Sequence, residues 1–196
     1  MSDQPYHLGP YFCENPHHDL LHQVLGHYPL WNQSTGIALE FGVGSGASLN
    51  CIARHFPVVG FDSFEGLPED WRPGFEAGMF AEDFDSVVEN TPEHCALVRG
   101  RFQDELPIWF SHDPEVIKEV QLVHIDCDLY SSTKVVLDNI EPVIARDKPT
   151  IVFDEWHGYP GCADHEQRAW REFVERTGVQ WDVIGHGHEA WGIKIK

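Results

Sequence analysis

Apolar and polar positions follow two periodicities that alternate along the chain. Short apolar runs predict β-strands at 36–41, 58–62, 95–98, 120–126, 149–154, 181–185 and 190–195. Apolar residues at helical spacing predict helices at 18–27, 47–56, 82–89, 103–110, 164–177 and one capped by Ser131 or Ser132. Repeated strand–helix units indicate an α/β fold, a Rossmann-like and mostly parallel sheet of seven strands. The last two strands are close in sequence and predict an antiparallel hairpin at the C-terminus.

The length of 196 residues and the 42% apolar content suit one domain that spans 1–196. Within it we expect the segment 1–35 to form an N-terminal helix or lid. The segment 64–81 is rich in proline, glycine and aromatic residues and has no clear periodicity. A connection of this length in a compact domain is typical of a functional loop, and we expect it beside the cleft.

Charge and composition restrict the partners. The formal net charge of −19 argues against a nucleic-acid partner, because such a protein needs a basic face. No apolar run is long enough to span a membrane, and the first residues do not resemble a signal peptide. The five cysteines are scattered and never in CxxC spacing, which indicates reduced thiols and a cytoplasmic protein. The sequence is compatible with a monomer or a homo-oligomer.

A glycine-rich turn follows the first predicted strand. Gly42, Gly44 and Gly46 lie between this strand and the next helix, and Glu40 precedes them. Such a turn lets the backbone approach a ligand closely. Asp62 ends the second strand, where its carboxylate can accept hydrogen bonds from two ribose hydroxyls. This pattern fits either a dinucleotide site or the nucleoside site of a methyltransferase.

Four carboxylates follow two other predicted strands. Asp126 and Asp128 come where one apolar run ends, and Asp154 and Glu155 come where another ends. The carboxyl ends of parallel strands meet at one edge of a sheet, so these groups should lie together and would repel one another without a cation. The cluster favours a methyltransferase that uses a divalent cation over a nicotinamide-dependent enzyme, which has no need of it.

The histidines are weaker candidates. His17, His18, His22, His27 and the pair His186 and His188 lack cysteines at ligand spacing and an HExxH helix, so we interpret them as solvated or hydrogen-bonded rather than as zinc ligands. His124 lies deeper on its strand than Asp126 and is expected to be buried and hydrogen-bonded.

These motifs together resemble a known family, the magnesium-dependent sugar O-methyltransferases of the macrocin and novobiocin type. The resemblance rests on LEFGVGSG (39–46), FDSFEGLP (61–68), GRFQDELP (100–107), HIDCDLYSST (124–133) and IVFDE (151–155). The segments occur in the order expected for the family and span about 37 to 158. Glu155 stands where the family usually has Asp, which lengthens one ligand arm by a methylene.

The resemblance implies a role for each matching residue. The metal, Mg²⁺ or another divalent cation, would be held by Asp126, Asp154 and Glu155, and Asp128 would be the general base. S-adenosylmethionine would be held by Glu40, Gly42, Gly44, Gly46 and Asp62, with Ser63 beside the ribose and Gln103 near the adenine.

We therefore expect an S-adenosylmethionine-dependent O-methyltransferase that acts on a hydroxyl of a small molecule, such as a sugar or a catechol-like natural product. Two alternatives stay open at this point. One is an NAD(P)-dependent oxidoreductase on the same fold, and the other is a non-catalytic protein that binds a nucleoside or a metal.

Overall fold

The computed structural model describes residues 18–31, 36–111 and 119–196. Its seven strands form one sheet in the order β3-β2-β1-β4-β5-β7-β6. Their bounds are β1 Ile37–Phe41, β2 Val58–Asp62, β3 Ala96–Arg99, β4 Val120–Ile125, β5 Thr150–Phe153, β6 Trp181–His186 and β7 Trp191–Ile195. The first five strands pair in parallel, whereas β7 pairs antiparallel with β5 and with β6. The predicted α/β fold, with its antiparallel C-terminal hairpin at the sheet edge, is confirmed.

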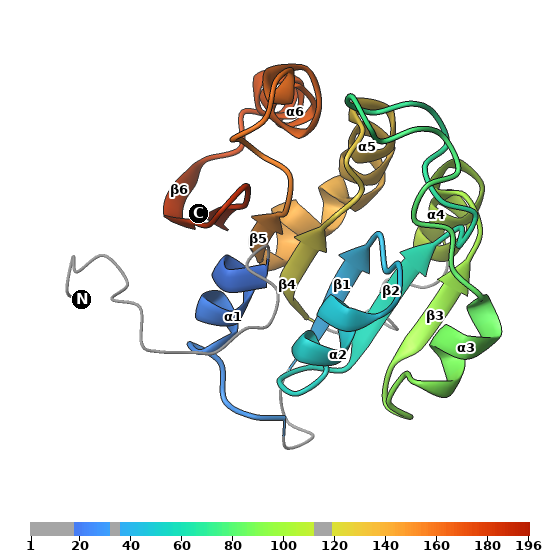
Figure 1. Cartoon of the computed structure of the whole chain (residues 1–196). Helices are drawn as coiled ribbons and strands as arrows, with labels where there is room; N and C mark the ends of the chain where they lie inside the picture. The colour runs from blue at the N-terminus through green and yellow to red at the C-terminus, as the bar shows by residue number, and fades with distance from the viewer. Residues whose placement is uncertain (1–17, 32–35, 112–118) are drawn as a thin grey trace.

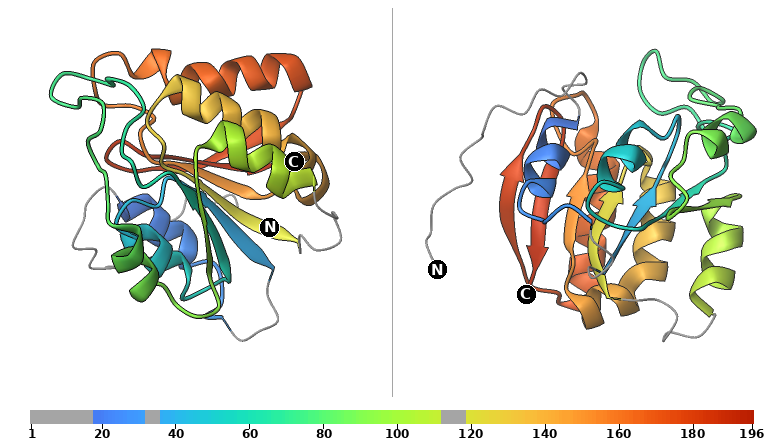
Figure 2. Two further views of the ribbon diagram at one scale, coloured as in Figure 1. Left: turned by 90° about the vertical axis from the view of Figure 1, so that its right-hand side faces the viewer. Right: turned by 90° about the horizontal axis from the view of Figure 1, so that it is seen from below.

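Helices cover both faces of the sheet (Figures 1 and 2). One face carries α1 Asp19–Leu25, α2 Ala47–Ile52 and α3 Phe84–Glu89, and the other carries α4 Phe102–Ser111, α5 Tyr130–Asp147 and α6 Glu166–Thr177. A short 3₁₀ helix, η2 Cys162–Asp164, precedes α6. All five residues of β1, the middle one of the five parallel strands, are buried, as expected for a parallel strand covered on both sides.

The two layers of helices enclose two hydrophobic clusters. The larger packs α4, α5 and α6 against the sheet and contains Phe41, Ile125, Phe153 and Trp170. The other packs α1 and α2 against the opposite face and contains Leu20, Leu49, Leu122 and Val152. Alternate residues of each strand thus enter different cores, which fixes the register at the carboxyl ends where the site lies.

Two helix termini differ from the prediction. The helix expected to reach residue 56 ends at Ile52, because the following amides of Arg54 and His55 bond three residues back and tighten the last turn. The expected cap of α5 by Ser131 or Ser132 is wrong, because the helix already begins at Tyr130. The Ser131 hydroxyl donates instead to Glu69 at 2.6 Å.

The structure describes only part of the N-terminal segment 1–35 but all of the loop 64–81. The expected helix near 18–27 is present as α1, whereas residues 1–17 and 32–35 lie outside the described residues. The loop 64–81 contains turns but neither helix nor strand, and it contributes several residues to the cavity described below. Among the described residues, no helix is both long enough and apolar enough to cross a membrane.

Candidate functional site

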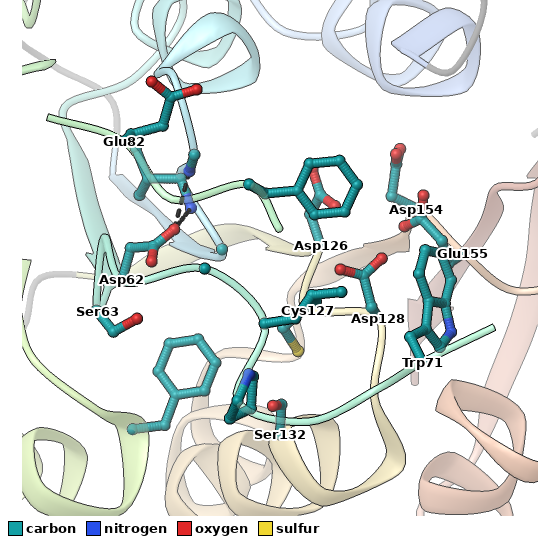
Figure 3. A pocket seen from close by; sticks show the side chains of 18 of the residues that line it. Asp62, Ser63, Trp71, Glu82, Asp126, Cys127, Asp128, Ser132, Asp154 and Glu155 are labelled. Carbon is teal, nitrogen blue, oxygen red and sulfur yellow. Dashed lines mark hydrogen bonds between the residues drawn. The ribbon is translucent and has the colours of Figure 1, made fainter. Parts of the chain in front are cut away.

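The carboxyl ends of the parallel strands meet at one edge of the sheet. Phe41 of β1 lies beside Phe61 of β2 and Ile125 of β4, and Ile125 lies beside Phe153 of β5. Hydrogen bonds continue one step past the strands, because the amides of Asp126 and Asp154 donate to the carbonyls of Phe41 and Ile125. The segments that follow the strands line one cavity of about 450 Å³ (Figure 3), at the edge where open α/β sheets bind ligands.

The first of these segments is the glycine loop after β1. Gly42 has a φ of 91°, and a Cβ atom there would lie 1.7 Å from the carbonyl oxygen of Asp126. Because that oxygen belongs to the backbone, only glycine fits. The close approach brings the glycine loop directly against the chain that carries the carboxylates.

Asp62 holds the glycine loop in place. Its Oδ2 accepts hydrogen bonds from the amides of Val43 and Gly44, each at 2.8 Å, and its Oδ1 accepts one from Phe64 (Figure 3). Asp62 also lines the cavity, as do Ser63 and Gln103. The carboxylate predicted to bind ribose therefore also shapes the loop that would meet the rest of a nucleoside.

The predicted carboxylate cluster is present. Potential ligand atoms of Asp126, Asp128 and Glu155 all lie within 4.8 Å of one another, and the same holds for Asp126, Asp154 and His18. The three predicted metal ligands thus divide between two groups that share Asp126. Strand β4 ends at Ile125, so strand alternation does not explain why Asp126 and Asp128 converge. A left-handed backbone at Asp128, with a φ of 60°, accompanies the turn there, a conformation that aspartate tolerates better than most residues.

Burial and mutual repulsion perturb these carboxylates. Burial, followed by the charge of Asp154, raises the pKa of Asp126 well above its ordinary value. The same two causes raise the pKa of Asp128 to about 7. Burial and then the charge of Asp126 raise the pKa of Glu155. Such a set favours either protons or a bound cation.

A buried histidine lies beneath the cluster. The Nδ1 atom of His124 is 2.9 Å from Oε1 of Glu40, and its Nε2 is 3.7 Å from Oδ1 of Asp154. Burial alone would lower the pKa of His124, but hydrogen bonding and the charges of Asp154 and Glu40 outweigh it and raise the pKa well above the ordinary value. The expectation of a buried, hydrogen-bonded histidine is confirmed.

An arginine and aromatic rings pack beside the carboxylate cluster. The guanidinium of Arg72 lies 4.0, 4.6 and 4.4 Å from the ring centroids of Trp71, Phe75 and Tyr159. It also pairs with Glu189 at 2.8 Å, and its side chain is only 13% exposed. Arg72 therefore ties the loop 64–81 to the segment after β5 and to the β6–β7 turn, with its charge near Asp128.

Most residues that the sequence assigned to the site line this cavity. They are Gly42, Gly44, Asp62, Ser63, Gln103, Asp126, Asp128, Asp154 and Glu155. Glu40 and Gly46 do not line it. Glu40 is fully buried and faces His124, and Gly46 adopts a φ of 83° at the start of α2.

The sequence analysis missed two residues of the site. His18, expected to be solvated or hydrogen-bonded, is 9% exposed and lines the cavity. Arg72 lies in a loop without periodicity, and only the aromatic residues around it hinted at a binding wall.

The fold and the site define a Rossmann-like protein in which one cavity joins a glycine loop to a buried carboxylate cluster. A family model described as a methyltransferase domain matches residues 39–156, more than half of the chain. The chain therefore belongs to this methyltransferase family. The expected class of enzyme is confirmed, and the family does not support the oxidoreductase alternative. No curated protein matches the chain.

Solved structures with the same fold include three methyltransferases, two of which are described as enzymes of natural-product pathways. The calicheamicin methyltransferase CalS11 is 23% identical, with a TM-score of 0.69 over 89% of this chain and 77% of its own. A second structure describes CalS11 as a TDP-rhamnose 3'-O-methyltransferase. The O-methyltransferase NovP is 20% identical, with a TM-score of 0.62 over 92% of this chain and 78% of its own. MycE, from the mycinamycin pathway, was solved with Mg and SAH (S-adenosylhomocysteine) and is 12% identical, with a TM-score of 0.52 over 83% of this chain and 45% of its own.

Proposed function

We propose that this protein transfers a methyl group from S-adenosylmethionine to a hydroxyl of a small molecule with the help of a divalent cation. The observation that carries the proposal is the single cavity that has the glycine loop and Asp62 at one end and the carboxylate cluster at the other. Two reactants bound at these ends would be held together, and this proximity supplies much of the acceleration in a bimolecular transfer.

The first end suits S-adenosylmethionine. The glycine loop leaves room for close backbone approach, and Oδ1 of Asp62 can accept a hydrogen bond from a ribose hydroxyl while the carboxylate holds the loop. Ser63 and Gln103 line the same cavity and would contact the ribose and the adenine. SAH in the structurally similar MycE is consistent with this assignment.

The other end suits a cation with oxygen ligands. Asp126, Asp154 and Glu155 would hold it. Oδ1 of Asp154 and Oε2 of Glu155 are buried and have no hydrogen-bond partner among the described residues. Unpaired buried carboxylate oxygens are costly, and a hard divalent cation such as Mg²⁺ would satisfy them. Magnesium in MycE supports the choice of ion.

The chemistry follows from the placement of Asp128. When bound, S-adenosylmethionine supplies an activated methyl group and a divalent cation lowers the pKa of a nearby hydroxyl. Asp128 lines the cavity within the carboxylate cluster, and its pKa of about 7 suits a group that must accept a proton near neutral pH. Asp128 would take the hydroxyl proton while the oxygen attacks the methyl carbon, and the bond from that carbon to sulfur would break to leave S-adenosylhomocysteine. The walls around Arg72 and Trp71 would exclude water from this step.

A sugar or a neighbouring pair of hydroxyls is the acceptor that we favour. CalS11 is described as a TDP-rhamnose 3'-O-methyltransferase, and NovP is an O-methyltransferase. A cavity of about 450 Å³ lies in the range typical of small-molecule sites. A reaction in the cytoplasm, without nucleic acid or membrane as partner, remains our expectation.

Calorimetry and turnover test the proposal. S-adenosylhomocysteine should bind, NADH should not, and chelation should abolish turnover of an acceptor panel of sugars, phenols and catechols until Mg²⁺ is restored. S-adenosylhomocysteine should still bind the chelated protein, because the glycine loop does not depend on the cation. Full activity in excess chelator would refute the role of the cation. A non-catalytic protein would instead bind nucleoside and cation and give no methylated product.

A further inference from the structure

We propose that His18 is a further ligand of the cation, and that its imidazole gives the site a preference for first-row transition metals such as Mn²⁺ over Mg²⁺. The inference rests on the proposed function, because it requires a cation at the carboxylate cluster. Its geometric basis is that a ring nitrogen of His18 and carboxylate oxygens of Asp126 and Asp154 all lie within 4.8 Å of one another. All three residues line the cavity.

Packing sets the position of His18. The residue immediately precedes α1, and its side chain makes no capping hydrogen bond to that helix. Four buried side chains anchor α1 to the sheet: Leu20, Leu21, Val24 and Leu25. The β6–β7 hairpin accommodates the helix through glycines, since a Cβ atom at Gly187 or Gly185 would come within 3.0 Å of Leu20. His18 is therefore held at the cavity by a docked helix.

The three groups can share one ion if their ligand atoms move closer together. Ligand atoms at about 2.1 Å from an octahedral ion are about 3 Å apart when adjacent and about 4.2 Å apart when opposite. Three ligands of one octahedral ion include at least two adjacent pairs, so atoms that lie up to 4.8 Å apart would have to approach each other by up to about 2 Å when the ion binds. Asp154 is only 3% exposed, and its buried Oδ1 has no hydrogen-bond partner among the described residues, so this oxygen is available to the ion.

The donor type determines the selectivity. Carboxylates alone suit Mg²⁺ and Mn²⁺ alike, whereas an imidazole nitrogen favours transition metals. Adding His18 to Asp126 and Asp154 changes an all-oxygen site into a mixed one. Mn²⁺ should then bind more tightly than Mg²⁺, and this difference should depend on His18.

Pulsed electron paramagnetic resonance of bound Mn²⁺ tests the contact directly. Wild-type protein should show modulation from a coordinated ¹⁴N nucleus, and His18→Ala should lose it. His18→Ala should also weaken Mn²⁺ binding in calorimetry by at least roughly 10- to 100-fold, the loss already typical when a residue that only orients a metal ligand is removed, and should weaken Mg²⁺ binding less. His22→Ala is the matched control, because His22 lies on the same helix but does not line the cavity.

Binding of S-adenosylhomocysteine reports whether each variant is folded, and His18→Gln replaces His18→Ala if the alanine variant is not. Bound Mn²⁺ without nitrogen modulation in the wild type, or modulation that persists in His18→Ala, would overturn the assignment of His18 and leave the proposed function intact. A wild-type protein that binds neither Mn²⁺ nor Mg²⁺ would overturn the cation in the proposed function, and with it this inference.

Discussion

Replacement of Asp128 by Asn should slow methyl transfer and, in the cation-free protein, stabilise the fold. Burial and the charge of Asp154 raise the pKa of Asp128 from 3.8 to about 7 in the folded protein. At about 1.4 kcal/mol for each pH unit between these values, the ionised carboxylate costs up to about 4 kcal/mol of folding free energy. Asn has nearly the same shape and carries no charge, so it avoids this cost.

The sign of the pH dependence follows from the raised pKa. Between pH 4 and pH 7 the folded protein binds a proton at Asp128 that the unfolded chain has already lost. Stability of the wild type should therefore fall as the pH rises through this range and level off above about 7. The stabilisation by Asp128→Asn should be small at pH 4 and reach its full size near pH 8.

Chemical denaturation of the chelated wild type and Asp128→Asn variant, at pH 4.5 and at pH 8, measures the stabilisation at each pH. In the presence of cation and substrates, the same variant should lower kcat by roughly 10²- to 10⁴-fold, the usual contribution of a general base, with little change in S-adenosylmethionine affinity. Near wild-type turnover would show that Asp128 is not the base. If Asp128→Asn changed the free energy of unfolding equally at the two pH values, the pKa of Asp128 would not be raised in the folded protein.

Three further variants test other parts of the site. Asp62→Ala should weaken S-adenosylhomocysteine in calorimetry by roughly 10- to 100-fold, because each charged hydrogen bond contributes about 1.5–3 kcal/mol, and unchanged affinity would exclude Asp62 from the nucleoside site. Gly42→Ala should destabilise the fold by about 3 kcal/mol or more, because its Cβ would meet backbone. Gly44→Ala, whose Cβ would have nothing within 4 Å, should cost about 1 kcal/mol for its left-handed backbone. Equal shifts in Tm for the two variants would contradict the expected difference. Arg72→Met should destabilise by about 3 kcal/mol because it leaves Glu189 buried and unpaired, and Arg72→Met combined with Glu189→Gln should recover part of the loss.

The sheet could be predicted because parallel strands buried on both faces leave continuous apolar runs. Ile37–Phe41 and Thr150–Phe153 are such runs, and every residue in them is buried. The ends of elements were less predictable, because they depend on contacts distant in sequence. The hydroxyl of Ser131 suits a helix cap by type, yet Glu69 from the loop 64–81 binds it.

The carboxylate cluster was predictable for a topological reason. Residues that follow parallel strands must converge, so the positions of Asp126 and Asp154 in the sequence were enough to bring them together. His18 lacked such a signal, because its place depends on how α1 docks on the hairpin. The glycines at 185 and 187 were visible in the sequence, but their contact with Leu20 was not.

The charge balance of the site connects its stability to its chemistry. Two basic side chains lie near the cluster, His124 beneath it and Arg72 near Asp128, and both are already engaged by other carboxylates, Glu40 and Glu189. His124 also lies 3.7 Å from Asp154. Even with both basic groups nearby, burial and then mutual repulsion raise the pKa values of Asp126, Asp128 and Glu155. A bound cation would relieve that repulsion and displace protons from the carboxylates. The same buried charges that weaken the empty fold would thus make cation binding favourable and leave Asp128 ionised for the reaction.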